Sequence, residues 1–291
     1  MTEPQLWLSV LEIGCFFALI ALGYQVTLVG AGFFNFAIGP YAMVAALGAS
    51  WFVTEWDMPV WLAVLCGLAI STIVSGLTEL LVVRPVQRRS GGGELPALVA
   101  VTAVMFIVQQ GAGALFGRRA LPGQQVVELG PWQIGSVYVT GATVLLIGTT
   151  AVAFAVMSAW MRWSRTGRLL RAVGDNRSAA ALLGLPVGRI RLIAFLVAGL
   201  IAGAAGILYA PKAGVAFTSG VSWTLVGFLA LVIGGTGRVW APLVGGLVLG
   251  AIQVFAPYYF GNLGPTTMVL VIALLFFAFR PQGLFVAKVR T

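Results

Sequence analysis

Long stretches without a single charged residue are the feature that most constrains this chain. Asp, Glu, Lys and Arg are absent from residues 13–54, 58–78, 95–117, 129–161, 192–211, 213–237 and 239–279. A helix that spans a bilayer needs about 20 apolar residues, so the first and last of these windows each have room for two spans. The sequence therefore predicts an all-α, polytopic integral membrane protein that forms a single transmembrane domain over residues 1–291.

The composition also excludes several kinds of chemistry. The chain contains no histidine, which rules out His-based acid–base catalysis and His-containing metal sites. Its two cysteines, Cys15 and Cys66, form no CxxC pair, and its only lysines, Lys212 and Lys288, do not follow the glycines of a P-loop. We therefore expect no metal, no enzyme activity and no ATP hydrolysis by the chain itself. The net charge of +9 is better explained by basic loops beside a membrane than by binding to nucleic acid.

The basic residues gather on one side of the expected membrane helices. With spans near residues 95–116, 139–161, 192–210, 223–237, 239–256 and 266–279, fourteen of the 17 basic residues fall on the same side. The positive-inside rule makes this side, and the C-terminus with it, cytoplasmic in a multi-pass protein of the cell inner membrane. Residues 6–83 allow either three spans, with an outside N-terminus, or two spans and a re-entrant piece. The expected total is therefore nine or eight.

Glycine occurs 38 times and has two interpretations. Pairs at small-xxx-small spacing, such as Gly199 with Gly203 and Gly246 with Gly250, indicate close helix packing in lipid. Glycines that cluster with polar residues, at 30–39 and 234–237, indicate that the helix is interrupted. Such interruptions at membrane depth are either tight turns or polar ligand sites, and both alternatives stay open at this point.

The segment 162–191 is the one long polar stretch, and it carries seven arginines. Asp175 or Asn176 is a suitable N-cap for a short helix whose apolar face holds Ala179, Leu182 and Leu183. A glycine at 184 and a proline at 186 then stop this helix. An exposed apolar face on such a helix calls for a membrane surface or a partner protein.

Several segments resemble the permease family of branched-chain amino acid ABC transporters. They are GRLLRAVGDNRSAAALLGLPVGRIRLIAFLVAGLIAGAAGILY (167–209), ELLVVRPVQR (79–88), the run 109–117, GGTGRVWAPLVGGLVLGAIQ (234–253) and FRPQGLF (279–285). They follow one another in the order of that family and cover most of the chain.

The resemblance implies a permease subunit of a binding-protein-dependent importer. Its partners would be a second permease subunit, two cytoplasmic ATPase subunits that bind the ATP, and an extracytoplasmic substrate-binding protein; this chain would need no cofactor of its own. The segment 162–191 would be the coupling loop, with the helix 177–183 docking on an ATPase. The coupling residues would be Gly167, Arg168, Arg171, Asp175, Asn176, Ala179, Ala180, Leu183 and Gly184.

The same resemblance suggests which residues face the substrate. Where the family commonly has NFAHGE, this chain has NFAIGP at 35–40, and Gln253 stands where the family often has Glu. These departures make the interior drier than the family pattern, while a branched-chain amino acid or a related small amino acid or amide remains the expected substrate. The candidate pathway residues are Asn35, Gly39, Thr102, Gln109, Gln110 and Gln253.

Two acidic residues, Glu12 and Glu79, fall within otherwise apolar material. A charge at mid-bilayer costs about 2.5 to 3.5 kcal/mol on insertion scales. We expect Glu79 to reach Arg84 or the membrane interface, and Glu12 to lie in a first helical turn at the membrane surface. The alternative function is an ion-coupled secondary transporter or channel, which would use one of these carboxylates as its ion site without any ATPase.

Overall fold

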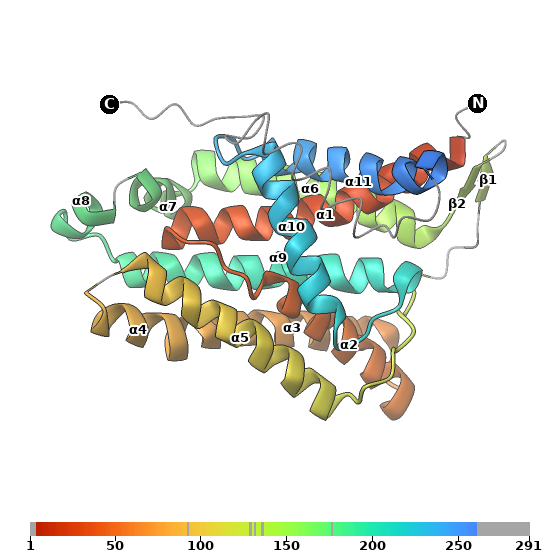
Figure 1. Ribbon diagram of the computed structural model, residues 1–291, viewed down its shortest axis with the longest axis horizontal. Coiled ribbons are helices and arrows are strands. Elements are labelled where there is room, and N and C mark those ends of the chain that lie inside the picture. Colours follow the sequence, from red (N-terminus) through yellow and green to blue (C-terminus); the bar gives the residue numbers. More distant parts are fainter. Residues whose placement is uncertain are drawn as a thin grey trace.

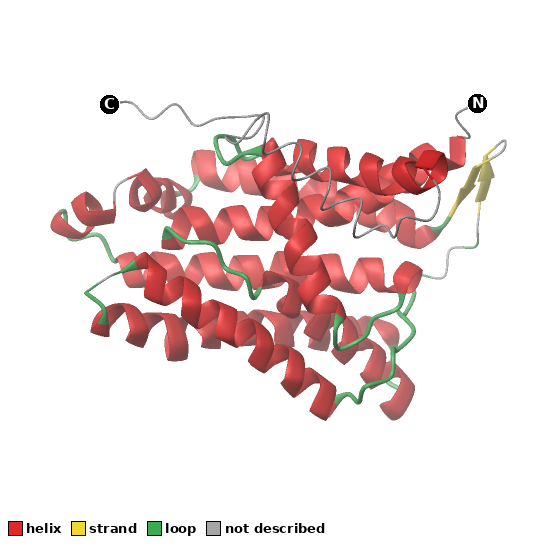
Figure 2. Cartoon of the chain, viewed as in Figure 1, coloured by secondary structure: helices red, strands yellow, loops and turns green. Residues whose placement is uncertain are grey.

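The chain folds into a bundle of long helices with one small hairpin (Figures 1 and 2). The computed structural model describes residues 4–260 apart from 92, 128, 129, 131, 135, 136 and 176. In chain order its elements are α1 (Pro4–Ala31), α2 (Ile38–Trp56), α3 (Val60–Leu77), the π-helical turn η1 (Thr78–Val83), α4 (Arg84–Arg89), α5 (Glu94–Leu115), the antiparallel strands β1 (Trp132–Ile134) and β2 (Val137–Val139), α6 (Gly141–Trp163), α7 (Arg165–Asp175), α8 (Arg177–Leu182), α9 (Val187–Ala213), α10 (Ser219–Gly234) and α11 (Ala241–Phe260).

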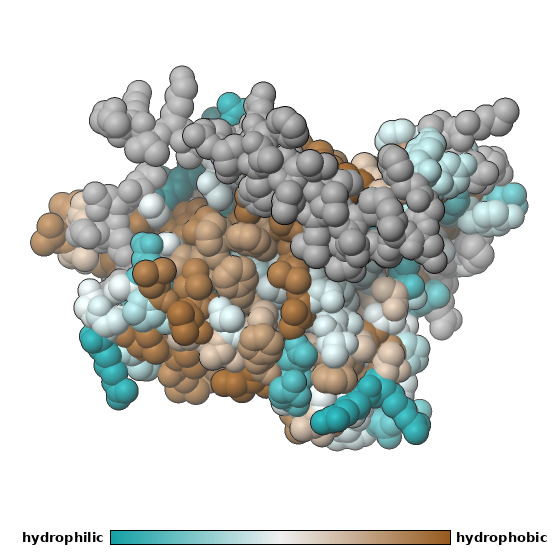
Figure 3. All heavy atoms as spheres, in the orientation of Figure 1, coloured by the Kyte–Doolittle hydropathy of each residue, from teal (hydrophilic) through white to brown (hydrophobic). Residues whose placement is uncertain are grey.

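Six of the described helices are long and apolar enough to cross a membrane, which confirms a polytopic helical membrane protein. They start at residues 4, 60, 94, 141, 187 and 241. Figure 3 shows hydrophobic residues over the middle of the visible face and hydrophilic ones at its edges, the pattern of a surface that meets lipid. The last expected span, 266–279, lies outside the described residues.

The bundle has two distinct ends. The basic end carries α4, α7, α8 and Arg238, whereas the hairpin end carries β1, β2 and Lys212 at the end of α9. Helix α1 starts at the hairpin end, where the Gln5 side chain bonds the backbone of Tyr138. It finishes at the basic end, where Gln25 Nε2 donates to the carbonyl of Arg238 at 2.8 Å.

The helices α1, α2 and α3 and the π-helical turn η1 precede Arg84. Of the described helices in this part, α1 and the continuous segment Val60–Arg89 are long and apolar enough to cross a membrane, whereas α2 is not among them. Helix α1 is buried on all sides from Gly14 to Thr27, so it forms the centre of the bundle rather than one of its faces. Tyr24 and Phe16 of α1 and Tyr41 of α2 are among the largest fully buried side chains.

The chain contains an inverted repeat of a long helix followed by a shorter broken one. Helix α1 packs on α10 and α11 in the way that α9 packs on α2 and α3, while α1 and α9 also pack on each other. Since α1 runs from the hairpin end to the basic end and α9 runs back, the two units have opposite directions. In Figure 1, α10 crosses the long helices at a steep angle.

Small residues allow these helices to approach closely, which confirms the packing interpretation of the glycine pairs. A Cβ added to Gly199 would lie 2.6 Å from Ser75 Cβ of α3, and one added to Gly246 would lie 2.5 Å from Ala18 N of α1. Hydroxyl groups strengthen the contact of α3 with α9, because Ser71 and Ser75 donate to carbonyls of Gly199 and Phe195 at 2.7 and 2.6 Å.

We predict that Gly206→Ala destabilises the fold whereas Gly111→Ala does not. A Cβ at Gly206 would lie 2.1 Å from the backbone oxygen of Ala42, and backbone cannot move aside cheaply. Overpacking of this kind costs about 1–3 kcal/mol. Gly111 has nothing within 4 Å, so alanine there should leave stability unchanged or raise it slightly. Thermal unfolding of both variants in detergent measures the difference, and equal melting temperatures would contradict the prediction.

Candidate functional site: the broken helices and the basic end

The interruption between α1 and α2 lies inside the protein. Helix α1 ends at Ala31 and is followed by Gly32, whose φ of +78° is one that glycine adopts without strain. After a bend at 32–33 the chain reaches Asn35, which is fully buried and whose Oδ1 accepts from the backbone N–H of Ala37 at 3.1 Å. This Asx turn starts α2 at Ile38. The prediction that the helix breaks within 30–39 is confirmed.

A second interruption, between α9 and α10, also follows a glycine. Helix α9 ends at Ala213, before Gly214 with φ +66°, and Ser219 Oγ, at the first residue of α10, accepts from the N–H of Ala216 at 3.1 Å. The sequence carries a signal of this symmetry, because both interruptions consist of Ala-Gly followed by Phe-x-x-Gly. The glycines at 234–237 form only the short connection between α10 and α11, with Gly235 at φ +87°.

The starts of α2 and α10 meet each other. A Cβ on Gly39 would lie 2.1 Å from the carbonyl oxygen of Gly220, so the two backbones touch at this point. Thr224 Oγ1 of α10 donates to the carbonyl of Phe36 at 3.0 Å, and the Tyr24 hydroxyl donates to the carbonyl of Thr224 at 3.1 Å. These contacts hold the centre of the molecule closed.

Two buried donor groups beside this contact have no hydrogen-bond partner. They are Asn35 Nδ2 and the Tyr41 hydroxyl, which lies beside the side chains of Thr78, Asn35 and Ser75. A buried donor without a partner is costly, so such a group is expected to acquire one during function. The positive ends of α2 and α10 point to the same region. Together these groups suit a polar ligand that accepts hydrogen bonds, such as a carboxylate.

The other candidate pathway residues are less clearly connected to this centre. Thr102 bonds back to Leu98 of its own helix at 2.9 Å, and Gln110 is exposed on the surface of α5. Gln109 is buried and Gln253 half-buried, and the side-chain oxygen of each has no partner. Among the described contacts, none joins either glutamine to Asn35. Tyr24, Tyr41 and Thr224 were not anticipated from the sequence, although all three lie at the centre.

Glu79 forms a buried ion pair near the basic end. Arg191 Nε and Nη2 donate to Glu79 Oε1 at 2.9 and 2.8 Å, and Arg191 Nη1 donates to Gln87. Both charged side chains are nearly inaccessible, with exposures of 5% for Arg191 and 0% for Glu79. The expectation that Glu79 pairs with Arg84 or reaches the interface is wrong, because Glu79 is fully buried and its ion pair is with Arg191 of α9.

Glu12 is also buried and paired, near the hairpin end. Its carboxylate accepts from Lys212 Nζ of α9 and from Thr143 Oγ1 of α6. The expectation of a first turn at the membrane surface is wrong: Glu12 lies in the third turn of α1, with 8% of its surface exposed. Helix α9 is therefore tied by one ion pair near each of its ends.

Part of the expected coupling loop packs on this chain itself. Leu170 and Val173 of α7 are buried in a cluster with Ala194 and Phe154. A Cβ on Gly167 would lie 2.2 Å from the carbonyl oxygen of Trp160, so this glycine allows α7 to turn tightly against α6. Arg168 Nη1 donates to the carbonyl of Trp163 at 2.8 Å and so satisfies the end of α6.

Helix α8 presents a smaller exposed face than the sequence suggested. Leu182 and Leu183 are 89% and 80% exposed, and Ala179 lies on the same exposed side. Ala180, in contrast, is 3% exposed and packs on the chain's own core, which leaves no surface there for a partner. Gly184 adopts φ +73° at the turn that follows α8. Asn176 and the side chain of Asp175 lie outside the described structure.

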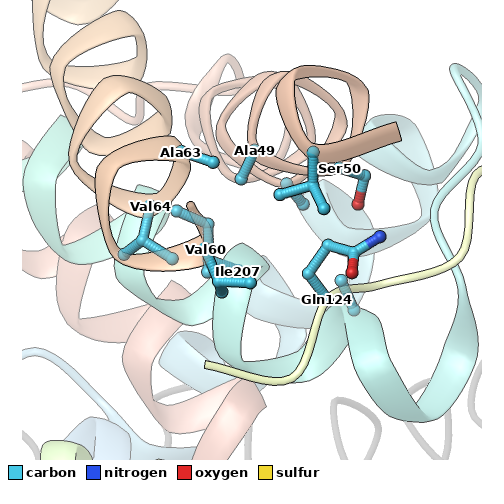
Figure 4. Close-up of a pocket in the computed structure, with 10 residues that line it drawn as sticks. Ala49, Ser50, Val60, Ala63, Val64, Gln124 and Ile207 are labelled. Atoms are coloured by element: carbon cyan, nitrogen blue, oxygen red, sulfur yellow. The ribbon is translucent and has the colours of Figure 1, made fainter. Parts of the chain in front are cut away.

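The hollow drawn in Figure 4 lies between α2, α3 and α9 near the hairpin end. Its walls are alanines and branched aliphatic residues, with Ser50 and Gln124 at one edge. The space is too narrow for a water molecule. It is therefore a packing gap rather than a ligand site.

We predict that Glu79→Gln strongly destabilises the protein. The variant leaves Arg191 buried without its counter-charge, and breaking a buried pair on one side costs about 3–5 kcal/mol. Glu55→Gln is the matched control, because Glu55 is exposed at the end of α2. Unfolding curves in detergent compare the free energy of unfolding of the two variants. An equal decrease in both would show that the buried ion pair stabilises the protein no more than an exposed carboxylate does.

The sequence as a whole has known relatives. Its residues 6–279 match the family described as "Branched-chain amino acid transport system / permease component". The high-affinity branched-chain amino acid transport system permease protein LivH of Salmonella typhimurium is 26% identical over 94% of this chain and 92% of its own length. The ribose import permease protein RbsC of Haemophilus influenzae is 29% identical over 81% of this chain and 72% of its own.

Among solved structures, PsaBC from Streptococcus pneumoniae in complex with Fab aligns with 93% of this chain and 89% of that chain, at 10% identity and a TM-score of 0.49. The family match extends over nearly the whole chain and includes both helix interruptions, the buried ion pairs and the polar loop. The protein therefore belongs to the permease-component family of branched-chain amino acid transport systems.

Proposed function

We propose that this chain forms the transmembrane pathway of an ATP-binding cassette importer for a branched-chain amino acid or a related small amino acid or amide. The observation that carries the proposal is the meeting of two inverted, broken helices at Gly39 and Gly220, beside the unpartnered donors of Asn35 and Tyr41. Transporters place substrate sites at such interruptions, because free backbone groups and helix ends can hold polar parts of a ligand.

The chemistry of this centre fits a substrate with a carboxylate and an apolar side chain. The described side chains around the contact, Asn35, Tyr41, Tyr24 and Thr224, are uncharged, and Ile38 next to them is fully buried in the core. The relatives support two substrate classes, since LivH is named for branched-chain amino acids and RbsC for ribose. A dry lining with few polar groups favours the amino acid, because a sugar needs many hydrogen-bond partners.

The basic end is then the cytoplasmic end, by the positive-inside rule. Of the two ATPase subunits, one would dock on this chain through Leu182 and Leu183 at the end of α8, while a substrate-binding protein would approach the hairpin end. A second permease subunit would complete the pathway. The ATP would be bound by the partners, with no cofactor in this chain, and the C-terminus would lie in the cytoplasm.

The ion-coupled alternative loses its two candidate carboxylates. Glu12 is paired with Lys212 and Glu79 with Arg191, so neither is available as a proton or sodium site in this state. Uptake by the single chain in liposomes, driven by a proton or sodium gradient without any ATPase, would nevertheless overturn the proposed importer function.

We predict that Asn35→Leu abolishes uptake in the reconstituted importer while assembly is retained. Leucine has the same branching and the same number of side-chain heavy atoms as asparagine but offers no donor to the ligand. The assay measures ATP-dependent uptake of labelled leucine, with ribose as the competing substrate, in proteoliposomes that hold the permease, ATPase and binding protein. The control is Thr102→Val, which should retain most of the uptake. In the described contacts the Thr102 hydroxyl donates only to the carbonyl of Leu98 in its own helix.

We also predict that Leu183→Asp abolishes substrate-stimulated ATP hydrolysis. The change places a charge in the apolar face of α8, and it should leave membrane insertion intact because the side chain is exposed. Ser90→Asp, which adds a charge at an exposed residue of the turn after α4, is the control and should leave hydrolysis unchanged. Normal hydrolysis in the Leu183 variant would argue against docking through α8.

A further inference from the structure

The π-helical turn η1 widens a helical segment that runs from Val60 to Arg89. The backbone N–H of Arg84 donates to the carbonyl of Glu79, five residues earlier instead of four. Pro85 follows directly, and in a regular helix its ring would clash with the carbonyl four residues before it. The wide turn gives this ring room. Turns of this kind occur frequently at functional sites, which makes η1 a candidate for a moving element.

One guanidinium group holds both sides of this turn. Arg191 of α9 donates through Nε and Nη2 to Glu79, which lies before Pro85, and through Nη1 to Gln87, which lies after it. The Glu79 and Arg191 side chains are nearly inaccessible, so water cannot replace either partner. The position of Arg191 therefore determines the shape of η1.

The same arginine lies close to the exposed leucines of α8. It is the fifth residue of α9, and the connection from α8 to α9 is short and hydrogen-bonded. The N–H of Leu185 donates to the carbonyl of Ala180 at 3.0 Å, and the N–H of Val187 donates to the carbonyl of Leu185 at 2.8 Å. In Figure 1, α8, α4 and the start of α9 lie at the same end of the bundle. A displacement of α8 is therefore passed on to Arg191.

The other end of η1 lies beside an unpartnered donor of the central contact. Thr78 is the first residue of η1, and its side chain lies with that of Asn35 beside the Tyr41 hydroxyl, which has no partner. The Thr78 hydroxyl donates to the carbonyl of Val74 at 2.8 Å, so toward Tyr41 its oxygen can act only as an acceptor. A shift of η1 toward Tyr41 would supply this acceptor and withdraw the donor from a ligand.

We propose that Glu79 and Arg191 are positioning residues, which pass the movement of α8 through η1 to the Tyr41 hydroxyl and so control release of the substrate. The inference rests on the importer function proposed above. In the described state, the Tyr41 hydroxyl is available to the carboxylate of the substrate. When the start of α9 moves with a docked ATPase, η1 shifts and the Tyr41 hydroxyl donates to Thr78 Oγ1 instead. The substrate loses one of its donors and dissociates.

Replacement of both charged residues by methionine separates this role from a structural one. A buried ion pair that only stabilises a fold can be exchanged for apolar residues of similar volume without loss of stability. We expect Glu79→Met/Arg191→Met to keep the wild-type melting temperature in detergent. In the reconstituted importer it should lower both the uptake of labelled leucine and the substrate stimulation of ATP hydrolysis about tenfold, a common size for coupling between two sites. Normal uptake and stimulation in the folded double variant would overturn the proposal.

A second pair of variants tests the other end of η1 without changing a charge. Thr78→Val keeps the shape of the side chain but removes the acceptor for Tyr41. Thr72→Val is the matched control, because Thr72 donates to Leu68 at 2.8 Å in the same way within α3. We expect Thr78→Val to lower kcat and KM of uptake together, since the substrate is released more slowly, and Thr72→Val to leave both unchanged. Equal kcat and KM in the two variants would overturn the proposal even if the double methionine variant did not fold.

The wild-type chain distinguishes failure of this inference from failure of the proposed function. If the wild type, reconstituted with its ATPase and binding protein, shows no ATP-dependent uptake of any amino acid or amide, the importer function is wrong and this inference with it. If the wild type transports and the variants transport equally well, only the role of Glu79 and Arg191 is wrong.

Discussion

The contact between the starts of α2 and α10 is the constraint on which the rest of the structure depends. Gly39 lets two backbones touch, because a Cβ there would lie 2.1 Å from the carbonyl oxygen of Gly220. Because both helices begin inside the bundle, their first N–H groups and the preceding turns must be satisfied by protein, and Asn35, Ser219 and Thr224 do so. Helix α1 packs on α10 and helix α9 packs on α2, so a long helix lies against each side of the contact.

Two ion pairs fix the position of α9 relative to this centre. A charge buried alone would cost several kcal/mol, so the buried Glu79, Arg191 and Glu12 each need an opposite charge, which Lys212, itself 38% exposed, supplies to Glu12. The first pair joins α9 to η1 at the basic end, and the second joins it to α1 near the hairpin end. The scarce charges inside the bundle are thus used to hold helices together, which is why neither carboxylate remains available to a transported ion.

The membrane character, most of the helix positions and the first interruption could be predicted from the sequence, because charge-free windows and clustered glycines are local signals. The partners of Glu12 and Glu79 could not, since Lys212 and Arg191 are distant along the chain and meet them only through packing. The burial of Ala180 also escaped prediction, because a six-residue helix has no periodicity that separates a docking face from a packing face. The second interruption was not predicted, although the sequence repeats there the Ala-Gly and Phe-x-x-Gly pairs of the first interruption.

The order of contacts along α9 explains how the proposed coupling surface can act on the proposed substrate site. The helix begins at Val187, directly after the loop with Leu182 and Leu183, and its Arg191 is bound to η1. Its middle packs through glycines on α3 and α2, and its end leads through Gly214 into α10 and the contact with Gly39. A close-packed helix moves as a unit rather than compressing, so a displacement of the loop reaches the central contact along α9. Opening of that contact would then expose the donors of Asn35 and Tyr41 to the substrate.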